Sequence, residues 1–429
     1  MTFRRTTQLP RLGAAVAAVA LVATACGGSS GGGSAAGSPS AGTETAASTI
    51  VGSASAPITK DSVTVGNVAT LSGPIPGLFQ GAPYGVDAYF AMVNSQGGVN
   101  GRKLALVSSD DALNCNENKT QTDKLVASTF AMVGSFSIYD DCGATVIAAH
   151  PQVPDVSVPI GDHAKALANL YSPQPQPAGY ALGPFVYFKQ KYAATKVGSI
   201  YGEGAAATSF KQQSEAMKSV GYQIVYARQA GNTETNFTSD VIRMRSEGVN
   251  FLWLTDFNAA GIARVLTAAK QQNWKPKLVV TPTAYDASFF KLIGDPSAAE
   301  GLMMPLAFSM FLGEDKAQVP AVATFDTWMH KVHPGFQPDL FSLYGWTSAA
   351  LFVDALKQAG SDPTPQAVLD ALKNTHDFDA DGLLAKADVG TKQPSGCWML
   401  ATIKSGKFVR VLPDKGFTCD PGGYYRATP

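Results

Sequence analysis

Residues 62–111 read SVTVGNVATLSGPIPGLFQGAPYGVDAYFAMVNSQGGVNGRKLALVSSDD, and this stretch decides the fold class. Residues 62–68 alternate apolar and polar side chains, which is typical of a half-buried strand. Apolar residues along residues 86–93 share one face of a helix, which two glycines end. Residues 104–107 form a second apolar strand. A strand, a helix and a strand in this order predict two parallel strands joined by a helical crossover.

The same alternation continues beyond this stretch and then restarts near residue 197. Further helices are expected at residues 118–127, 144–149, 210–219, 237–245 and 259–271. Further strands are expected at residues 131–134, 156–158, 197–201, 223–226, 251–254 and 278–281. Two such series predict two lobes, each a parallel sheet covered by helices. Because ligands of such sheets lie beyond the carboxyl ends of the strands, we expect the binding site in the cleft between the lobes.

Residues 1–25 have the pattern of a secretory signal peptide. Their first part contains three arginines and no acid, and the apolar run that follows is too short to cross a bilayer core of ~30 Å at ~1.5 Å per residue. The run ends in Leu-Val-Ala-Thr-Ala-Cys26, which resembles the lipobox of bacterial lipoproteins and implies lipidation of Cys26. An ordinary signal peptide with an unrelated cysteine is the alternative. Residues 26–59 are mostly Gly, Ser, Ala and Thr, so we expect a flexible, lipid-anchored tether.

The chain carries 33 Lys and Arg against 33 Asp and Glu. This neutrality argues against a nucleic-acid partner, which requires a surplus of cations. Lipidation of Cys26 leaves four cysteines, an even number that fits disulfides in an oxidising compartment. The favoured pairs are Cys115 with Cys142 and Cys397 with Cys419, because partners close in sequence usually share a lobe. Other pairings and a metal site remain alternatives.

Motifs spread over the chain carry a resemblance to a known family. They are Leu71-Ser72-Gly73-Pro74, Gly81, Gly85, residues 94–101, Asp110-Asp111-Ala112, Tyr201-Gly202-Glu203-Gly204, Gly294, Glu300-Gly301 and Tyr344-Gly345-Trp346. In these motifs the chain resembles the extracellular solute-binding proteins of branched-chain amino acid ABC transporters, from about Val63 to Val411. Cys115 and Cys142 also fall where that family carries its disulfide.

The resemblance implies the type I periplasmic-binding fold, an α/β fold of two doubly wound parallel-sheet lobes with the ligand cleft between them. Three crossovers would join the lobes, near Leu182, residues 304–307 and residues 378–382. The N-terminal lobe would comprise residues 60–182 and 307–378, and the C-terminal lobe residues 183–306 and 379–429.

The resemblance also implies a binding protein without catalytic activity or cofactor, lipid-anchored at the outer face of the bacterial cytoplasmic membrane. As a monomer it would capture a small polar or amphipathic ligand, such as an amino acid or a related carboxylate or amide. It would deliver this ligand to the permease subunits of an ABC importer. A ligand-sensing lipoprotein of the same fold is the first alternative, and an exported enzyme is the second.

Two loops of the N-terminal lobe match those that hold a ligand carboxylate in this family, through hydroxyl and backbone N–H groups. The candidate residues are Ser135, Phe136 and Ser137 in one loop, and Ile160 and Gly161 in the other. For both serines, capping of the loop itself is the alternative role.

Aromatic side chains usually line the floor of the cleft in this family, and Phe79, Tyr201 and Phe257 match such positions. Burial in the core is the alternative for each of them. We also expect the loop with Thr283 and Tyr285 to contact the ligand.

That loop contains no acid, although the family generally places a carboxylate there to pair the ligand's ammonium group. An unpaired buried ammonium would be costly. Glu203, Asp256 and Asp286 are the substitutes that the sequence offers. The ligand is therefore an amino acid held differently, or a carboxylate or amide without an ammonium group.

Three further patterns each have a simpler alternative. Residues 202–207 fit the G-x-G-x-x-A dinucleotide fingerprint, with Arg228 as a partner for a 2′-phosphate, but equally form a tight strand-to-helix turn. Residues 377–388 have the spacing of a calcium loop with Asp in place of the final Glu, and in the family this stretch is a crossover. His330 and His333 are spaced for one helical face without a third zinc ligand, so we expect solvated helix residues.

Overall fold

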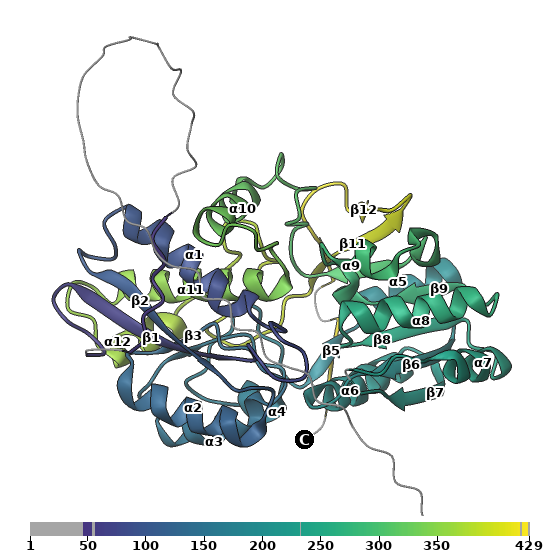
Figure 1. The fold of residues 1–429 in the computed structure, drawn as a ribbon, viewed down its shortest axis with the longest axis horizontal. Coiled ribbons are helices and arrows are strands. Elements are labelled where there is room, and N and C mark those ends of the chain that lie inside the picture. The colour runs from purple at the N-terminus through teal and green to yellow at the C-terminus, as the bar shows by residue number, and fades with distance from the viewer. Residues whose placement is uncertain (1–45, 54–55, 232, 421–422, 428–429) are drawn as a thin grey trace, which may run out of the picture. The chain divides into compact units, whose positions relative to one another are not determined.

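The computed structural model describes residues 46–53, 56–231, 233–420 and 423–427. The expected signal peptide, Cys26 and the first part of the expected tether lie outside these described residues. Within them the chain forms two α/β lobes, each built on its own sheet (Figure 1). None of the helices in these ranges is long and apolar enough to cross a membrane.

The first sheet contains four parallel strands in the order β2-β1-β3-β4. They are β1 (Ser62–Ala69), β2 (Lys103–Asp110), β3 (Met132–Val133) and β4 (Asp155–Val156). The helices that follow them are α1 (Gly81–Ser95), α2 (Cys115–Ser128), α3 (Asp140–Ala149) and α4 (Asp162–Lys165). The predicted alternation is confirmed. Strand β1 is buried on both faces rather than one, because it is a central strand with helices on each side.

The second sheet has the order β12-β11-β10-β9-β8-β6-β7, and β13 pairs with β11. Its strands are β6 (Lys196–Tyr201), β7 (Gln223–Gln229), β8 (Phe251–Thr255), β9 (Leu278–Val280), β10 (Met303–Leu306), β11 (Cys397–Lys404), β12 (Lys407–Leu412) and β13 (Thr418–Cys419). Its helices are α5 (Gly183–Tyr192), α6 (Ala205–Ser219), α7 (Thr238–Ser246), α8 (Ala259–Gln271), α9 (Phe289–Ile293) and the short η1 (Pro282–Ala284) and η2 (Pro296–Ala299).

Strands β6 to β10 are parallel as expected, but β11, β12 and β13 add an antiparallel edge that the sequence reading missed. The chain turns between β11 and β12 at Ser405 and Gly406, which have φ of 51° and 70°. Two positive φ values are what a two-residue hairpin turn needs, so this Ser-Gly pair was a usable signal.

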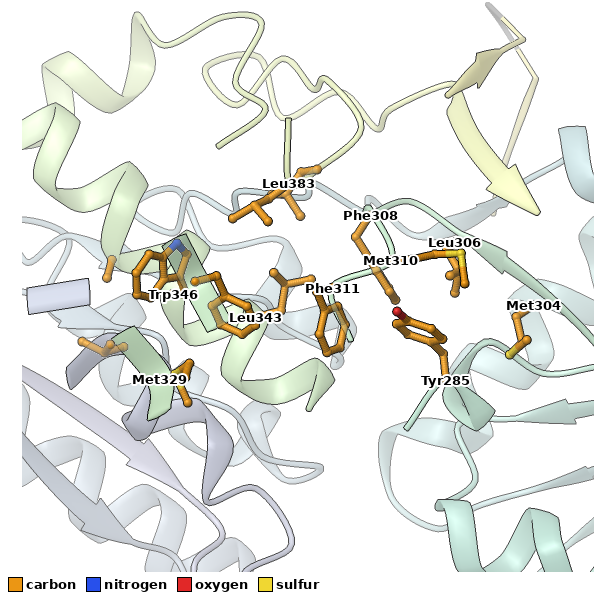
Figure 2. Close-up of a cluster of buried hydrophobic side chains, with 14 of the residues drawn as sticks. Tyr285, Met304, Leu306, Phe308, Met310, Phe311, Met329, Leu343, Trp346 and Leu383 are labelled. Carbon is orange, nitrogen blue, oxygen red and sulfur yellow. The ribbon is translucent and has the colours of Figure 1, made fainter. Parts of the chain in front are cut away.

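Two of the segments that connect the lobes lie side by side. Phe308 forms an antiparallel bridge with Leu384, and the Ala385 N–H donates to the carbonyl of Ala307 at 2.8 Å. Figure 2 shows the buried side chains around them, with Tyr285 from the second lobe and Trp346 from the first lobe in one cluster. The helices that pack on the first lobe after this crossing are α10 (Pro320–Val332), α11 (Leu340–Gln358) and α12 (Pro365–Lys373).

The last crossover lies later than the expected residues 378–382. Ala387 still pairs with Phe378, and the Lys392 ammonium donates to the carbonyl of Leu167 at 2.6 Å. These partners belong to the first lobe, so the chain joins the second sheet only at β11, and the expected lobe boundary after residue 378 is too early. The C-terminal strand β14 (Tyr424–Arg426) then pairs with β5 (Gly179–Ala181) beside the first crossover.

Helices α1 and α11 touch through their backbones. A Cβ on Gly85 would lie 2.0 Å from the carbonyl oxygen of Ser342, and one on Gly345 would lie 2.0 Å from that of Ala82. Any side chain at these two positions would therefore push the helices apart. This contact gives a physical reason for two of the glycines on which the family resemblance rests.

Both favoured disulfides are present. Cys115–Cys142 joins α2 to α3, and Cys397–Cys419 joins β11 to β13. Each pair closes a loop inside one lobe, with sequence separations of 27 and 22 residues. In the chain-entropy model each contributes about 3 kcal/mol to stability.

The last part of the expected tether is packed on the first lobe. We call residues 46–51 the strap. Val51 N–H donates to the Leu106 carbonyl at 2.8 Å, and Leu106 N–H donates to the Thr49 carbonyl at 3.0 Å, so the strap covers the open edge of β2. The tether expected over residues 26–59 is therefore wrong for its final residues, because backbone pairing outweighs their small side chains.

The side chain of Asp87 in α1 binds the strap. Its buried carboxylate accepts hydrogen bonds from the Thr49 N–H at 2.5 Å, from the Thr49 hydroxyl at 2.6 Å and from the Ser48 hydroxyl at 2.7 Å. His333 Nε2 lies 3.0 Å from the same carboxylate, and its ring stacks on Tyr84. Burial alone would raise the pKa of Asp87, but the hydrogen bonds from His333, Thr49 and Ser48 outweigh it and hold the pKa below its usual value. His333 is thus not the solvated helix residue that its spacing suggested.

We expect Asp87→Asn to release the strap, because an amide replaces the charged acceptor of these hydrogen bonds, which contribute about 1.5–3 kcal/mol each to stability. Hydrogen exchange at Thr49 and Val51, corrected for intrinsic rates, should become faster at pH 7. In the unchanged chain the carboxylate stabilises the strap above the ordinary carboxyl pKa of about 3.9 and loses this effect as the pH falls through its lowered pKa. Asp123→Asn, on the exposed face of α2, is the matched control. Equal exchange in both variants would contradict the assignment.

Candidate ligand-binding site

The loops at the carboxyl ends of both sheets meet in one region. Ala205 N–H, at the start of α6, donates to the carbonyl of Ile138 in the loop after β3 at 3.4 Å. Gly204 has φ of 64°, and a Cβ there would lie 2.9 Å from the same carbonyl oxygen. The turn over residues 202–207, read from sequence as a tight strand-to-helix turn, is therefore one part of the second lobe that contacts the first.

A second contact joins the lobes through Gln212 of α6. Its Nε2 donates to both carboxylate oxygens of Asp162, at 2.8 and 2.7 Å, and its Oε1 accepts from Gly179 N–H at 3.0 Å. Lys165 lies one helical turn further along α4, with its Nζ 3.8 Å from Asp162 and its side chain 10% exposed. Charged groups of the first lobe thus face the second lobe directly.

Asp256 is the carboxylate of the second lobe at this place. It follows β8 with φ of 42°, a conformation that costs most residues energy and that Asp tolerates better than most. The residue is exposed to solvent, yet protein surroundings raise the pKa of its carboxyl, which Ser209 and Lys165 offset only in part. The exposure and the raised pKa are compatible, because water can reach a carboxyl group that protein atoms surround on most sides.

The charge of the Asp256 carboxylate acts on two tyrosines that belong to other elements. Burial, together with the nearby charge of Asp256, raises the pKa of Tyr180 in β5 and that of Tyr344 in α11. Asp256 therefore interacts electrostatically with Lys165 and Tyr344 of the first lobe and with Tyr180 of a crossover. This group brings together parts of the chain that lie far apart in sequence.

An aromatic wall borders the same region on the first lobe. Phe79 and Phe136 pack edge to face at 4.8 Å, and Phe341 lies 4.6 Å from Phe79 and 4.9 Å from Phe136. Tyr344 lies 5.7 Å from Phe136. Phe79 and Phe136 are buried, whereas Phe341, Tyr344 and Ile160 are half-buried at its edge. The predicted aromatics Phe79 and Phe136 form the back of the wall. Its accessible part consists of the predicted Ile160, of Tyr344 and of Phe341, which the sequence did not single out.

The polar groups expected to hold a carboxylate are already engaged. Ser135 Oγ accepts from Val68 N–H at 3.1 Å. The buried Ser137 hydroxyl donates to Asp111 and accepts from Tyr139 N–H at 3.0 Å. Both serines thus have the loop-capping role that was their alternative. The N–H groups of Ile160 and Gly161 donate to the chain's own Asp140.

The remaining predicted residues of the second lobe divide into core and surface. Phe257 and Tyr285 are 1% and 2% exposed, and the Tyr285 hydroxyl donates to Glu314 at 2.7 Å. Their prediction as ligand contacts is not supported, because both side chains turn into the core below the sheet edge. Thr283 is half-buried and donates to the carbonyl of Phe257 at 2.8 Å. Tyr201 stacks on Phe210 at 4.4 Å and is half-buried.

Of the three acids that could replace the missing carboxylate, Asp256 fits best. Glu203 is exposed in the turn that contacts Ile138. Asp286 accepts from the N–H of Ser288 at 2.7 Å, which is a local cap. Burial raises the pKa of Asp256, and the charge of Lys165 from the first lobe acts on the same carboxyl.

Comparison with known proteins agrees with this geometry. A family model described as periplasmic binding protein matches residues 62–407. The chain belongs to this family. The Leu/Ile/Val-binding protein homolog 7 of Brucella abortus is 24% identical over 245 residues, which are 53% of this chain and 60% of that protein. The chain thus matches less than two thirds of this relative.

Solved structures of this family share the fold. A branched chain amino acid ABC transporter structure from Thermus thermophilus with bound valine has a TM-score of 0.71 at 18% identity, over 85% of this chain and 98% of that one. A fatty acid ABC transporter substrate-binding protein from Thermomonospora curvata has a TM-score of 0.72 at 17% identity, over 86% and 95%. The expected type I periplasmic-binding fold with two lobes is confirmed.

The residues that the sequence reading missed are Lys165, Tyr180, Gln212, Phe341 and Tyr344. Lys165 had a usable signal, because it follows the predicted Gly161 by four residues in the same loop-to-helix turn. Tyr344 was part of the family motifs but had no role assigned. Tyr180 and Gln212 had no local signal, since only the crossovers bring them here.

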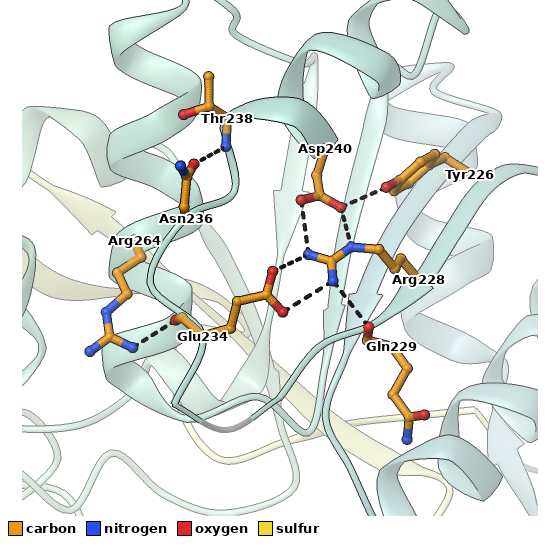
Figure 3. Close-up of polar contacts among 8 residues, drawn as sticks. All are labelled: Tyr226, Arg228, Gln229, Glu234, Asn236, Thr238, Asp240 and Arg264. Atoms are coloured by element: carbon orange, nitrogen blue, oxygen red, sulfur yellow. Dashed lines mark hydrogen bonds and ion pairs between the residues drawn. The ribbon is translucent and has the colours of Figure 1, made fainter. Parts of the chain in front are cut away.

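Arg228 does not serve a dinucleotide. Figure 3 shows its guanidinium between two carboxylates: it donates to Glu234 at 2.7 Å and to Asp240 at 2.9 Å. The Tyr226 hydroxyl donates to Asp240 at 2.6 Å in the same network. These internal acids raise the pKa of Arg228 and take up its charge, so a 2′-phosphate would have to displace them.

The calcium-loop pattern forms a turn of the crossover. Phe378 and Ala387 pair across it, and Asp388 accepts from the Thr391 N–H at 3.0 Å and lies 2.8 Å from His376 Nδ1. The final acid of the pattern is therefore bound to protein groups. Among the described residues no group of three His, Cys, Asp or Glu is arranged to hold a metal ion.

Gly204→Ala should weaken the contact between the lobes, because its new Cβ would press on the carbonyl of Ile138. Gly416→Ala is the matched control: Gly416 has a similar φ of 62° and nothing within 4 Å of its Cβ position. Both variants lose about 1–2 kcal/mol from backbone strain. We expect a further loss, and faster exchange of the Ala205 amide, for Gly204→Ala alone. Equal losses in urea unfolding would contradict the contact.

Proposed function

We propose that this chain is an extracellular solute-binding lipoprotein that captures a small amphipathic ligand between its two lobes and delivers it to an ABC importer. The observation that carries the proposal is the contact between the lobes at the carboxyl ends of both sheets, where Ala205 N–H donates to the Ile138 carbonyl and Gln212 donates to Asp162. Asp256 of the second lobe interacts there with the charge of Lys165 of the first. A ligand placed there contacts both lobes at once. It then stabilises the arrangement in which both lobes contact it, and a permease can recognise that arrangement.

The binding surface that we propose has a polar and an apolar side. Asp256 follows β8, and Glu203 and Thr283 follow the neighbouring strands β6 and β9; together they supply the acceptors of the second lobe. Phe341 and Tyr344 supply the apolar surface of the first lobe. The relatives support a small-molecule ligand in general, since one solved structure holds valine and another protein is named for fatty acids. The fold alone therefore does not decide the ligand.

Delivery to a membrane transporter agrees with the sequence before the strap. We propose that Cys26 is lipidated and that the residues between it and the strap link the lobes to the membrane. The strap supports this by fixing where the link leaves the first lobe, at the outer edge of β2. A force on the link would then act on the Asp87 hydrogen bonds and not on the ligand site.

A panel of amino acids, carboxylates, amides, amines and polyols, tested by thermal shift and then by calorimetry, should identify at least one ligand. At 100 times its Kd such a ligand stabilises the folded chain by about 2.7 kcal/mol. Asp256→Asn should weaken its binding about tenfold or more, because a charged hydrogen bond contributes about 1.5–3 kcal/mol. Asp414→Asn, an exposed acid away from the site, should leave the affinity unchanged. No ligand in the panel, or equal affinity in both variants, would contradict the proposal.

Cys26→Ala should move the protein out of the membrane fraction of the expressing bacterium, because the acceptor of the lipid is lost. Mass spectrometry of the mature N-terminus should show a diacylglyceryl group on the unchanged chain and none on the variant. Ser29→Ala, three residues further along, is the control that should stay with the membrane. An unchanged chain whose mature N-terminus carries no lipid would refute the anchor.

A further inference from the structure

Three backbone donors of the first-lobe loops already bind carboxylates of the chain itself. Ile160 N–H donates to Asp140 Oδ2 at 2.7 Å, and Gly161 N–H donates to Asp140 Oδ1 at 3.1 Å. Ala164 N–H donates to Asp141 Oδ1 at 3.0 Å. A carboxylate from α3 thus already occupies the two adjacent N–H groups that could hold an anion. A ligand carboxylate would have to displace it.

Gly161 shows that this arrangement is built into the loop. Its φ is −71°, which any residue can adopt, so the backbone itself does not require glycine. A Cβ at this position would lie 2.0 Å from Asp141 Oδ1 and 2.7 Å from Asp140 Oδ1. Glycine is needed here because the two carboxylates approach the backbone, and not because of the turn.

The hydroxyl donors of the neighbouring loop are engaged in the same way. Ser137 donates to the buried Asp111, and Ser135 accepts from Val68 N–H. Asp140 and Asp155 border a cavity of about 40 Å³ between these loops. Burial raises the pKa of Asp140 to about 6, and the nearby charge of Asp141 adds to this against the loop N–H groups. The first lobe therefore offers acids where a carboxylate-binding site needs donors.

Most of the charged groups around the site are carboxylates. Lys165 is paired with Asp162 at 3.8 Å and also interacts with Asp140 and Asp256. One ammonium group thus balances three carboxylates. A carboxylate brought in by a ligand would add a further negative charge to this group. It would also find the N–H groups of Ile160 and Gly161 already bound to Asp140.

We propose that the ligand is recognised through a nitrogen head group that donates hydrogen bonds, an amine or an amide, and carries no carboxylate. Its head donates to the Asp256 carboxylate, and its apolar body lies against Phe341 and Tyr344. The inference rests on the proposed function and names the ligand class for the same site. The proposal distinguishes this chain from proteins that bind zwitterionic amino acids. The carboxylate of such an amino acid would need the N–H donors that Asp140 occupies.

The test compares three probes with one apolar body: 3-methylbutylamine, 3-methylbutanamide and 3-methylbutanoate. Calorimetry on the full chain, with L-valine and L-leucine beside them, should show the amine or the amide binding at least tenfold more tightly than the carboxylate and the amino acids. Tighter or equal binding of 3-methylbutanoate or of an amino acid overturns the inference and leaves the proposed function standing. If neither these compounds nor the wider panel bind, the proposed function itself is overturned.

A variant tests the role of Asp140 directly. Asp140→Ala vacates the Ile160 and Gly161 N–H groups, so we expect it to gain affinity for 3-methylbutanoate by tenfold or more. Asp140→Asn removes the charge but keeps an acceptor at the N–H groups, so its gain should be smaller. No gain in a folded Asp140→Ala chain, as judged by its circular dichroism, overturns the inference. If that variant does not fold, the Asp140→Asn gain and the probe comparison on the unchanged chain decide.

Discussion

The strands of a parallel sheet all end at the same edge, and this constraint decides where ligand-facing side chains of the present fold can gather. In the first sheet the strand order reverses between β1 and β3, and in the second it reverses between β6 and β8. The loops after these four strands diverge at each reversal and leave room for a ligand. Phe79 and Phe136 follow β1 and β3, whereas Gly204 and Asp256 follow β6 and β8. The aromatic wall and the acid thus lie at the two reversal points, and the contact of Gly204 with Ile138 brings them toward each other.

Buried polar groups explain why several suitable side chains at this edge serve the fold instead of a ligand. The carboxylate of Asp111 accepts from Thr70, Asn118 and Ser137, and in this way it ties β1, α2 and the loop after β3 together. Leaving one of these groups unpaired would cost about 1–3 kcal/mol. A ligand that binds the Ser137 hydroxyl would therefore have to displace its structural partner Asp111. The same holds for the N–H groups of the next loop, whose partner is Asp140.

The strand and helix alternation could be predicted from sequence because each element carries its own apolar period, as α8 does at residues 259–271. Helix α11 was missed because most of its residues are buried, so it has no polar face to reveal a period, although Asp339 and Ser342 form its capping box. At the site, the sequence predicted which loops lie at the edge of the sheets, but not the direction in which each side chain points. Phe257 and Tyr285 follow strands as expected, yet the chain turns both side chains into the core. Tyr180 and Gln212 belong to the site through long-range contacts, which no local pattern encodes.

The distribution of charge links ligand binding to the approach of the lobes. Lys165 of the first lobe interacts with Asp140 and Asp162 of its own lobe and with Asp256 of the second lobe. The hydrogen bonds of Gln212 and Ala205 also hold the two lobes together. In the proposed mode of binding, a ligand that donates hydrogen bonds to Asp256 compensates one of the three carboxylates that share this ammonium group. A ligand shifts a conformational equilibrium only by its differential affinity for the two states. In that mode the difference comes from compensating an acid, so the contact that selects the ligand would also stabilise the lobes in contact.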